Sequence, residues 1–263
     1  MGAVEVFVEN SVRADGFEIR YLEAGDGPPL VSLHGAGGLR LSRAHDLLAG
    51  THRVIVLEAP GFGESPANDR TSSLPELAGT MLRALDTIEI ERFSLWGQSF
   101  GGKLALWLAL QDPERLESLV LSSPAAISDN PPPYPRPEEM ASILYAHPDR
   151  QTDTGSLAPD VDAKQRALVG RLIGPPRDPE LEAAMRTLEV PTLVLFGTED
   201  RLTPPELGRI YRALLPQCHF VIVYDAAHVI FADRPEAFAA IVTDFVERRA
   251  EFVMRQESGL LYP

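Results

Sequence analysis

The sequence predicts an α/β fold: a mostly parallel, eight-stranded sheet with helices on both faces and a helical segment inserted into it. Short β-branched or aliphatic runs recur along the 263 residues, and helical periodicity or loop separates most of them. Such alternation is typical of a parallel sheet that is covered on both sides. The eight runs are Val4–Val8, Phe17–Leu22, Leu30–Leu33, Arg53–Leu57, Phe93–Trp96, Leu119–Ser122, Leu193–Phe196 and Phe220–Val223.

Local signals support the individual elements in chain order. Only a short polar stretch separates the first two runs, which predicts an antiparallel pair at the sheet edge. Ser73-Leu-Pro-Glu76 is a capping box and predicts a helix towards Leu85. Another helix is expected over Lys103–Leu110, soon after the fifth run. Asp233-Arg-Pro-Glu236 predicts the start of the last helix, whose apolar stripe is Phe238, Ile241, Val242 and Phe245.

Residues 126–189 break this alternation, because they contain ten prolines and no strand candidate. We therefore predict that 1–125 and 190–263 form the core and that 126–189 is an inserted module. Helical periodicity occurs twice inside the module. One face of the first piece carries Met140, Ile143, Leu144 and His147, and one face of the second carries Leu168 and Leu172.

Composition narrows the classes of function. With 38 acidic and 24 basic residues the formal net charge is −14, which repels phosphate backbones and anionic lipid surfaces. We expect a small-molecule substrate rather than nucleic acid or a membrane as partner, and the sequence leaves the oligomeric state open. No run approaches the roughly 18 apolar residues of a membrane span, and the N-terminus lacks a signal-peptide pattern, so a cytoplasmic protein is expected. The single cysteine, Cys218, is expected to pack as a small hydrophobe.

The strongest motif is Gly97-Gln-Ser-Phe-Gly101, which lies between a predicted strand and a predicted helix. In this context G-x-S-x-G indicates a nucleophile elbow, a sharp turn that exposes the hydroxyl of Ser99 above the sheet. Small residues are needed on either side because the turn leaves no room for a Cβ atom.

Two later strand ends supply the partners that a serine nucleophile requires. The run Leu193–Phe196 leads to Asp200, and the run Phe220–Val223 leads to His228. Loops after the carboxyl ends of parallel strands share one crevice, so these side chains can converge on Ser99. His228 would take the serine proton, and Asp200 would orient the imidazole and stabilise its charged form.

A small-residue loop after the third run, His34-Gly-Ala-Gly-Gly38, resembles the motif that donates an amide to an oxyanion hole. We assign the hole to the backbone N–H groups of Ala36 and of Phe100, the residue after the nucleophile.

With these motifs in this order, the chain resembles an α/β-hydrolase with a serine nucleophile, similar to esterases, over nearly its whole length. Glu58-Ala-Pro-Gly-Phe-Gly-Glu-Ser65 resembles the acidic-x-Pro-Gly-x-Gly-x-Ser loop of that family, with Glu58 in place of the usual Asp. The resemblance implies that residues 126–189 form a cap over the substrate pocket. No cofactor is expected, and no metal, because the other histidines show no metal-ligand spacing such as H-x-x-x-H: His45, His52, His147 and His219.

Several residues have alternative interpretations. Glu199, Asp225 or an acid near Asp129 could replace Asp200, although Asp200 fits the strand-end spacing best. His34 is expected to brace its loop rather than act as a second base. A phosphate-binding loop over Gly97–Lys103 is disfavoured, because Leu104 stands where Ser or Thr would be needed to hold Mg²⁺.

The reaction expected first is cleavage of a small or medium carboxylic ester through an acyl-enzyme. Carbon–carbon bond hydrolases share the serine, but their usual Asn before it and Trp after the histidine are here Gln98 and Val229. Lactonase, thioesterase and perhydrolase activities remain open, as does a small-ligand receptor that retains the triad. Apolar side chains of the inserted module would line the pocket or form the module's own core: Tyr134, Met140, Ile143, Leu144 and Leu168.

Overall fold

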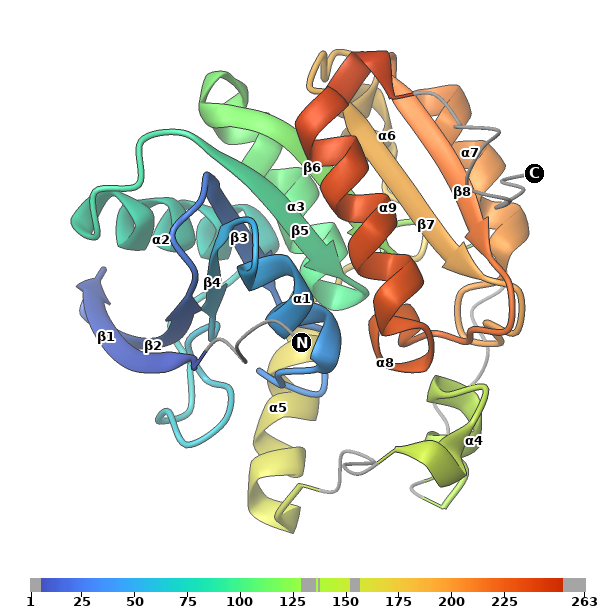
Figure 1. Cartoon of the computed structure of the whole chain (residues 1–263). Helices are drawn as coiled ribbons and strands as arrows, with labels where there is room; N and C mark the ends of the chain where they lie inside the picture. Colours follow the sequence, from blue (N-terminus) through green and yellow to red (C-terminus); the bar gives the residue numbers. More distant parts are fainter. Residues whose placement is uncertain (1–5, 129–135, 137, 152–156, 253–263) are drawn as a thin grey trace.

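The computed structural model describes residues 6–128, 136, 138–151 and 157–252, and it contains one eight-stranded sheet (Figure 1). The strand order is β1-β2-β4-β3-β5-β6-β7-β8, and only β2 runs against its neighbours. The predicted mostly parallel, eight-stranded sheet is thus confirmed. Its strands are β1 (Val8–Ala14), β2 (Phe17–Ala24), β3 (Pro29–Leu33), β4 (Arg53–Leu57), β5 (Phe93–Gln98), β6 (Leu116–Ser122), β7 (Thr192–Gly197) and β8 (Cys218–Val223).

The predicted position of the first strand is wrong, because β1 begins where the expected run Val4–Val8 ends. Asp15 and Gly16 form the two-residue turn of the hairpin, with φ of 49° and 73°, and this turn pairs Ala14 with Phe17. An Asp-Gly turn with two positive φ angles matches the twist of a hairpin. The turn fixes the register and places Val12 and Ala14 on the buried side.

Helices cover both faces of the sheet, as predicted (Figure 1). One apolar cluster joins one face of the sheet to α2, α3, α6 and α7, and a second joins the other face to α1 and α9. The helices are α1 (Arg43–Ala49), α2 (Leu74–Thr87), α3 (Phe100–Gln111), α4 (Met140–Leu144), α5 (Pro159–Leu172), α6 (Pro179–Met185), α7 (Gly208–Leu214), α8 (Ile230–Asp233) and α9 (Pro235–Arg248).

The two helix starts expected from sequence have different outcomes. Ser73 caps α2, since its side chain accepts a hydrogen bond from the N–H of Glu76. The apolar stripe of α9 is buried as expected, but no side chain caps this helix. Asp233 instead accepts hydrogen bonds from the N–H groups of Ala146 and Ala227, each at 2.9 Å. The capping interpretation of Asp233 is therefore wrong, because its carboxylate serves two loops that the sequence gives no reason to bring together.

The segment between β6 and β7 contains α4, α5 and α6. The first two lie beyond the arrowheads of β5, β7 and β8, at the end of the sheet where the predicted site residues lie (Figure 1). In contrast, α6 contributes Leu181 and Met185 to the core cluster on the face of α3. Helix α4 ends at Leu144, so His147 does not share its face; Pro148 follows and begins a short 3-10 turn. Tyr134 and Asp129 lie outside the described residues.

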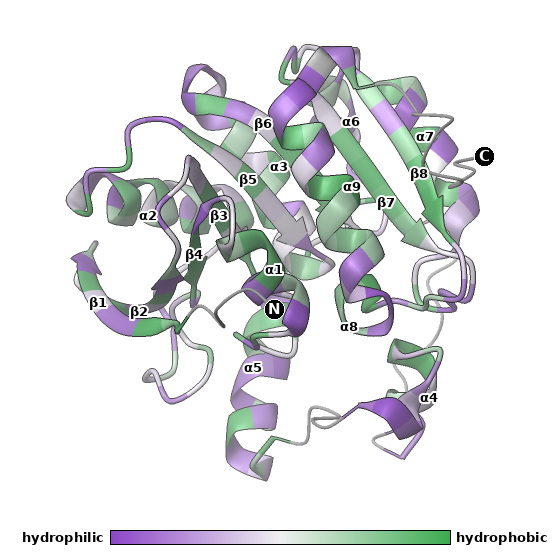
Figure 2. Cartoon of the chain, in the orientation of Figure 1, coloured by the Kyte–Doolittle hydropathy of each residue, from purple (hydrophilic) through white to green (hydrophobic). Residues whose placement is uncertain are grey.

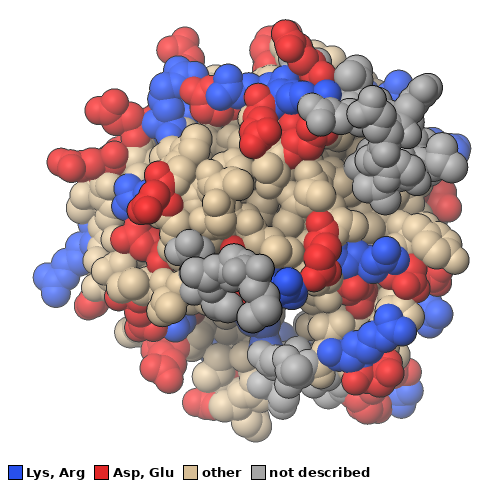
Figure 3. All heavy atoms as spheres, viewed as in Figure 1, with Lys and Arg blue, Asp and Glu red and all other residues tan. Residues whose placement is uncertain are grey.

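Hydropathy follows this arrangement. Strands β4, β7 and β8 are largely apolar, whereas much of α5 is hydrophilic (Figure 2). Acidic and basic side chains are interspersed around the rim of the face in Figure 3, so the net charge of −14 is not gathered into one patch on this face. In the described part of the chain, no helix has the length and apolar character needed to cross a bilayer. Cys218 packs partly buried against the larger apolar cluster, as expected.

Candidate active site

Ser99 lies in a strained turn between β5 and α3, with φ of 52° and ψ of −113°. Backbone groups hold it there: its N–H donates to Ser122 O at 3.0 Å, and its carbonyl accepts from the N–H of Ala125 at 2.9 Å. A Cβ atom on Gly97 would lie 2.4 Å from Gly101 O, and one on Gly101 would lie 2.3 Å from Leu33 O. The glycines of the motif are therefore required by backbone contact, as a strained elbow demands.

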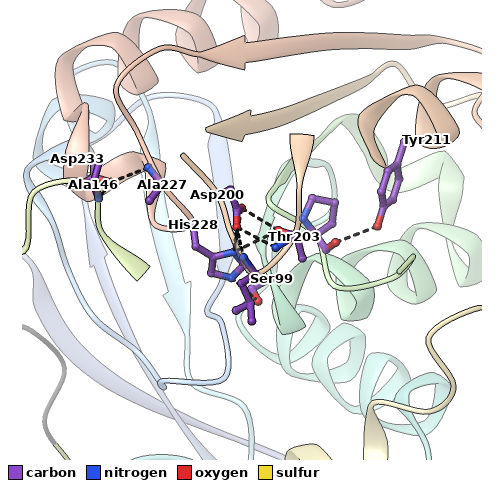
Figure 4. Close-up of polar contacts among 10 residues, drawn as sticks. Ser99, Ala146, Asp200, Thr203, Tyr211, Ala227, His228 and Asp233 are labelled. Atoms are coloured by element: carbon purple, nitrogen blue, oxygen red, sulfur yellow. Dashed lines mark hydrogen bonds and ion pairs between the residues drawn. The ribbon is translucent and has the colours of Figure 1, made fainter. Parts of the chain in front are cut away.

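Ser99, His228 and Asp200 come together in the structure (Figure 4). The Oγ of Ser99 lies 2.9 Å from Nε2 of His228, and Nδ1 of His228 lies 3.0 and 3.2 Å from the two carboxylate oxygens of Asp200. All three residues are buried, with exposed fractions of 8%, 2% and 4% respectively. Residues from three loops thus form one hydrogen-bonded chain in the order that proton transfer from a serine requires.

The loop after β7 holds the carboxylate of Asp200 in place. One oxygen accepts from the N–H groups of Leu202 and Thr203 at 2.9 and 2.8 Å, and the other accepts from the Thr203 hydroxyl at 2.8 Å. Burial raises the pKa of Asp200, but the charge of His228 and the hydrogen bonds from His228 and Thr203 outweigh it, so the pKa is lowered. Asp200 is therefore ionised at neutral pH, as a residue that stabilises an imidazolium must be.

The loop after β3 and the start of α3 contain the two amides assigned to the oxyanion hole. Phe100 is the first residue of α3, and its N–H is among those that lack an acceptor within the helix. Ala36 lies in the turn Gly35–Gly38, which is closed by a 3.1 Å bond from Gly38 N–H to Gly35 O. No hydrogen bond found among the described residues uses either N–H group.

His34 contacts its own loop. Its Nε2 accepts from the N–H of Ala59 at 3.0 Å, so Nδ1 carries the proton and donates to Gly35 O at 2.7 Å. Burial lowers the pKa of His34 to about 4. A neutral histidine with both nitrogens engaged braces the loop and is not available as a base for Ser99.

The other acids and the lysine of the motif have different surroundings. Glu199 is exposed, and Asp225 pairs with His147 at 2.8 Å and with Arg234 at 3.4 Å. The ammonium of Lys103 donates to the carbonyls of Ile173 and Pro175, just after α5. Burial lowers the pKa of Lys103. In the described residues, no group of three or more His, Cys, Asp or Glu side chains is placed to hold a metal ion.

Sequence reasoning missed two residues that contact this region. Thr203 binds Asp200 and lies 3.2 Å from Nδ1 of His228, and its position three residues after Asp200 was a signal for this turn. Gln165, on α5, contacts Ala36 from the segment between β6 and β7. No local pattern indicates the second contact, because it depends on how α5 docks.

The structure combines an α/β sheet, a serine at a strand–turn–helix elbow, and a histidine and an acid that each follow a strand. This combination is typical of α/β-hydrolases. Residues 30–241 match the Alpha/beta hydrolase family, and the chain belongs to that family.

Several known proteins are similar over most of their length. The chain is 31% identical to the pimeloyl-(acyl-carrier protein) methyl ester esterase of Aeromonas salmonicida, with 84% of this chain and 96% of the relative covered. It is 28% identical to the 2-hydroxy-6-oxo-6-(2'-aminophenyl)hexa-2,4-dienoic acid hydrolase of Metapseudomonas resinovorans, with 93% of each covered. The crystal structure of a bacterial membrane phospholipase A superimposes with a TM-score of 0.79 at 26% identity, covering 92% of this chain and 86% of that one.

Proposed function

We propose that this enzyme is a serine hydrolase that cleaves a small or medium carboxylic ester through an acyl-enzyme. Ser99 is the nucleophile, His228 the general base and acid, and Asp200 the residue that orients His228. The observation that carries this proposal is the buried chain of contacts from Ser99 Oγ through His228 to Asp200, at 2.9 and 3.0 Å. An esterase among the relatives supports the same class of bond.

Each residue has a defined role in the proposed reaction. Ser99 Oγ bonds to the ester carbonyl carbon while its proton moves to His228 Nε2 and the π electrons move to the carbonyl oxygen. The N–H groups of Ala36 and Phe100 bind that oxyanion. The bond to the alkoxide then breaks, and His228 returns the proton to the leaving alcohol. Water, deprotonated by His228, releases the acid from Ser99 by the same steps.

We further propose that residues 126–189 act as a cap over this site, with α4 and α5 covering the ends of the strands. Contacts join α4 to the loop that bears the histidine: Val229 N–H donates to Leu144 O at 3.0 Å, and Asp233 holds Ala146. The substrate would therefore meet side chains of both regions.

A second candidate is cleavage of a carbon–carbon bond in a 2-hydroxy-6-oxo dienoic acid. The relative from Metapseudomonas resinovorans, which is named for such a substrate, favours it. Gln98 and Val229 depart from the residues usual in those enzymes and favour the ester. Comparing kcat/KM for p-nitrophenyl butyrate and for a 2-hydroxy-6-oxo-hexadienoate separates the two, because the preferred bond gives the larger value.

Labelling and turnover test the nucleophile. The wild-type protein is expected to hydrolyse p-nitrophenyl butyrate and to gain one fluorophosphonate adduct, mapped to Ser99 by mass spectrometry. Ser99→Ala should lose the adduct and several orders of magnitude in kcat, since it removes the nucleophile of a unit that acts together. Ser94→Ala is the matched control, because this buried serine lies on β5, the strand that leads to Ser99, and its hydroxyl contacts only Ser118 among the described side-chain contacts. Turnover by the Ser99→Ala protein at the wild-type rate would refute the proposal, and labelling without turnover would favour a receptor.

A further inference from the structure

Gln165 connects helix α5 to the turn that contains Ala36. Its side chain is only 1% exposed, in the interior of α5 (Pro159–Leu172). Its Nε2 donates to Ala36 O at 3.3 Å, and its Oε1 accepts from the N–H of Gly63 at 2.9 Å. One partner only accepts and the other only donates, so the contacts fix which end of the amide faces which loop. Gln165 also forms part of the wall of a pocket of about 550 Å³ beside Gly37 and Gly38.

Two peptide planes meet at Ala36, and hydrogen bonds hold the carbonyl of each. In a trans peptide the N–H of Ala36 points opposite to the carbonyl of Gly35. That carbonyl is held by Nδ1 of His34 at 2.7 Å and by the N–H of Gly38 at 3.1 Å. Gln165 holds the following carbonyl, of Ala36 itself. The plane between Gly35 and Ala36 carries the N–H, and Gln165 holds the plane that follows it. With both planes held, the φ and ψ angles of Ala36 are set, so the plane that carries the N–H cannot turn about them.

Other side chains anchor α5 without touching this turn. Lys164 donates to the carbonyls of Gly63 and Ser65 at 2.8 and 2.5 Å, and Arg171 donates to Asn68 O. Leu168 is buried in the core cluster. The helix therefore has several attachments of its own, and among the side-chain hydrogen bonds from α5 to the core, that of Gln165 is directed at the turn over 35–38.

We propose that Gln165 is a positioning residue for the oxyanion hole, supplied to the core by the segment between β6 and β7. It acts through Ala36: by holding the Ala36 carbonyl it keeps the Ala36 N–H aimed at the developing oxyanion. This inference rests on the proposed function. It means that the docked α5 helps to stabilise the tetrahedral intermediate formed at Ser99, in addition to any contact it makes with substrate.

The test uses two variants of Gln165 and a neighbour as control. Gln165→Met keeps the length of the side chain and removes both hydrogen bonds. Gln165→Glu still accepts from Gly63 but, as a carboxylate, it cannot donate to Ala36 O. Lys164→Met removes a polar attachment of the same helix and leaves the turn over 35–38 untouched. For each protein, kcat and KM for p-nitrophenyl butyrate are measured, with the Ki of a butyl trifluoromethyl ketone and of butyrate. Thermal unfolding shows that each variant is folded.

The ketone reports on the oxyanion hole, because Ser99 Oγ adds to its carbonyl carbon, the proton passes to His228, and the oxygen becomes an oxyanion. Losing one donor of such a hole costs about 10²–10³ in kcat, so a misdirected donor should cost about 10- to 100-fold. We expect this loss in kcat for Gln165→Met and Gln165→Glu, an equal weakening of the ketone, and KM and butyrate Ki within about threefold of wild type. Lys164→Met should stay within about threefold in all four values.

Three results would overturn the positioning role in an active wild-type protein: kcat retained in Gln165→Met, activity retained in Gln165→Glu, which would assign the effect to Gly63, or an equal loss in Lys164→Met. A wild-type protein with neither turnover nor a Ser99 adduct would refute the proposed function itself, and the role of Gln165 with it.

Discussion

At the scale of single residues, Asp200 shows how the surroundings of a side chain decide its chemistry. Two backbone N–H groups bind one carboxylate oxygen, from Leu202 and Thr203, while the other oxygen faces the Thr203 hydroxyl and His228. In an asparagine at this position, the NH₂ group cannot take the place of the oxygen bound by Leu202 and Thr203, because it would face two N–H donors. An asparagine would therefore place its NH₂ group towards Nδ1 of His228.

We expect Asp200→Asn to force His228 into the wrong tautomer, with the proton on Nε2, where it can no longer accept the proton of Ser99. The loss in kcat should be on the order of 10²–10⁴, with little change in KM. Steady-state kinetics measures the loss, and ¹⁵N spectra of labelled histidine report the tautomer. Glu199→Gln is the control, because Glu199 directly precedes Asp200 in the chain and is exposed. A crippled Glu199→Gln beside an active Asp200→Asn would place the acid one residue earlier.

The sequence indicates Ser99, Asp200 and His228 because each follows a strand in a short local motif. Their roles as a catalytic set remain a prediction. The contacts of Thr203 and Gln165 are harder to predict from the sequence. The contact of Thr203 with Asp200 is indicated only by its position three residues further along the chain. The contact of Gln165 depends on how α5 docks, and no periodic or compositional pattern points to its partner.

At the scale of elements, the β1–β2 hairpin shows the same division between local and long-range signals. The Asp15-Gly16 turn is a local signal that would have corrected the position of β1. The docking of this turn is long-range: Asp15 accepts from Thr80 Oγ1 and from Nε of Arg83, both on α2 and both at 2.6 Å. Likewise the cap at Ser73 was visible in the sequence, whereas the use of Asp233 by Ala146 and Ala227 was not.

We expect Gly16→Ala to lower the free energy of unfolding by about 1–2 kcal/mol, because φ at this residue is +73° and a side chain is strained there. The neighbouring atom, Nη1 of Arg70, lies 3.2 Å from the new Cβ and can move aside, so the backbone dominates the cost. Gly170→Ala is the opposite control, since this residue lies inside α5 with nothing within 4 Å of an added Cβ. It should stabilise by about 0.5–1 kcal/mol. Urea unfolding checks both, and equal effects of the same sign would contradict the argument.

At the scale of the whole molecule, each of the two apolar layers contains a buried histidine. The ring centroids of His34 and Phe62 lie 4.6 Å apart in one layer, and those of His45 and Trp96 lie 4.9 Å apart in the other. His45 accepts the N–H of Ser42 on Nδ1, as His34 accepts that of Ala59 on Nε2. Protonation would replace each accepted hydrogen bond with a clash of two donors. Burial accordingly lowers the pKa of both histidines to about 4.

These two pKa values make the stability of the protein depend on pH. An unfolded histidine has a pKa near 6.5 and takes up a proton as the pH falls below that value, while His34 and His45 in the folded protein stay neutral until about pH 4. Between about pH 6.5 and pH 4 the unfolded state therefore binds more protons than the folded state. The free energy of unfolding decreases as the pH is lowered through this range. Each histidine can cost about 3 kcal/mol once the pH is below both values.

Two other effects oppose this loss of stability in acid. Acid neutralises carboxylates and reduces the self-repulsion of a protein with a net charge of −14. Glu58 acts in the same direction, because burial raises its pKa and folding then favours the protonated form. Salt screens the first effect but leaves the buried groups nearly unchanged, so a measurement at about 0.5 M NaCl retains the contributions of the buried histidines and of Glu58.

We expect the free energy of unfolding in urea, at high salt, to fall steadily from pH 7 to pH 4.5. His45→Gln removes one of the buried histidines whose pKa is lowered, while its amide oxygen can still accept the N–H of Ser42, so the curve should become flatter. His219→Gln serves as control, since this histidine is only partly buried and should leave most of the dependence in place. If His45→Gln kept the full dependence, the loss of stability in acid would have to come from groups other than His45.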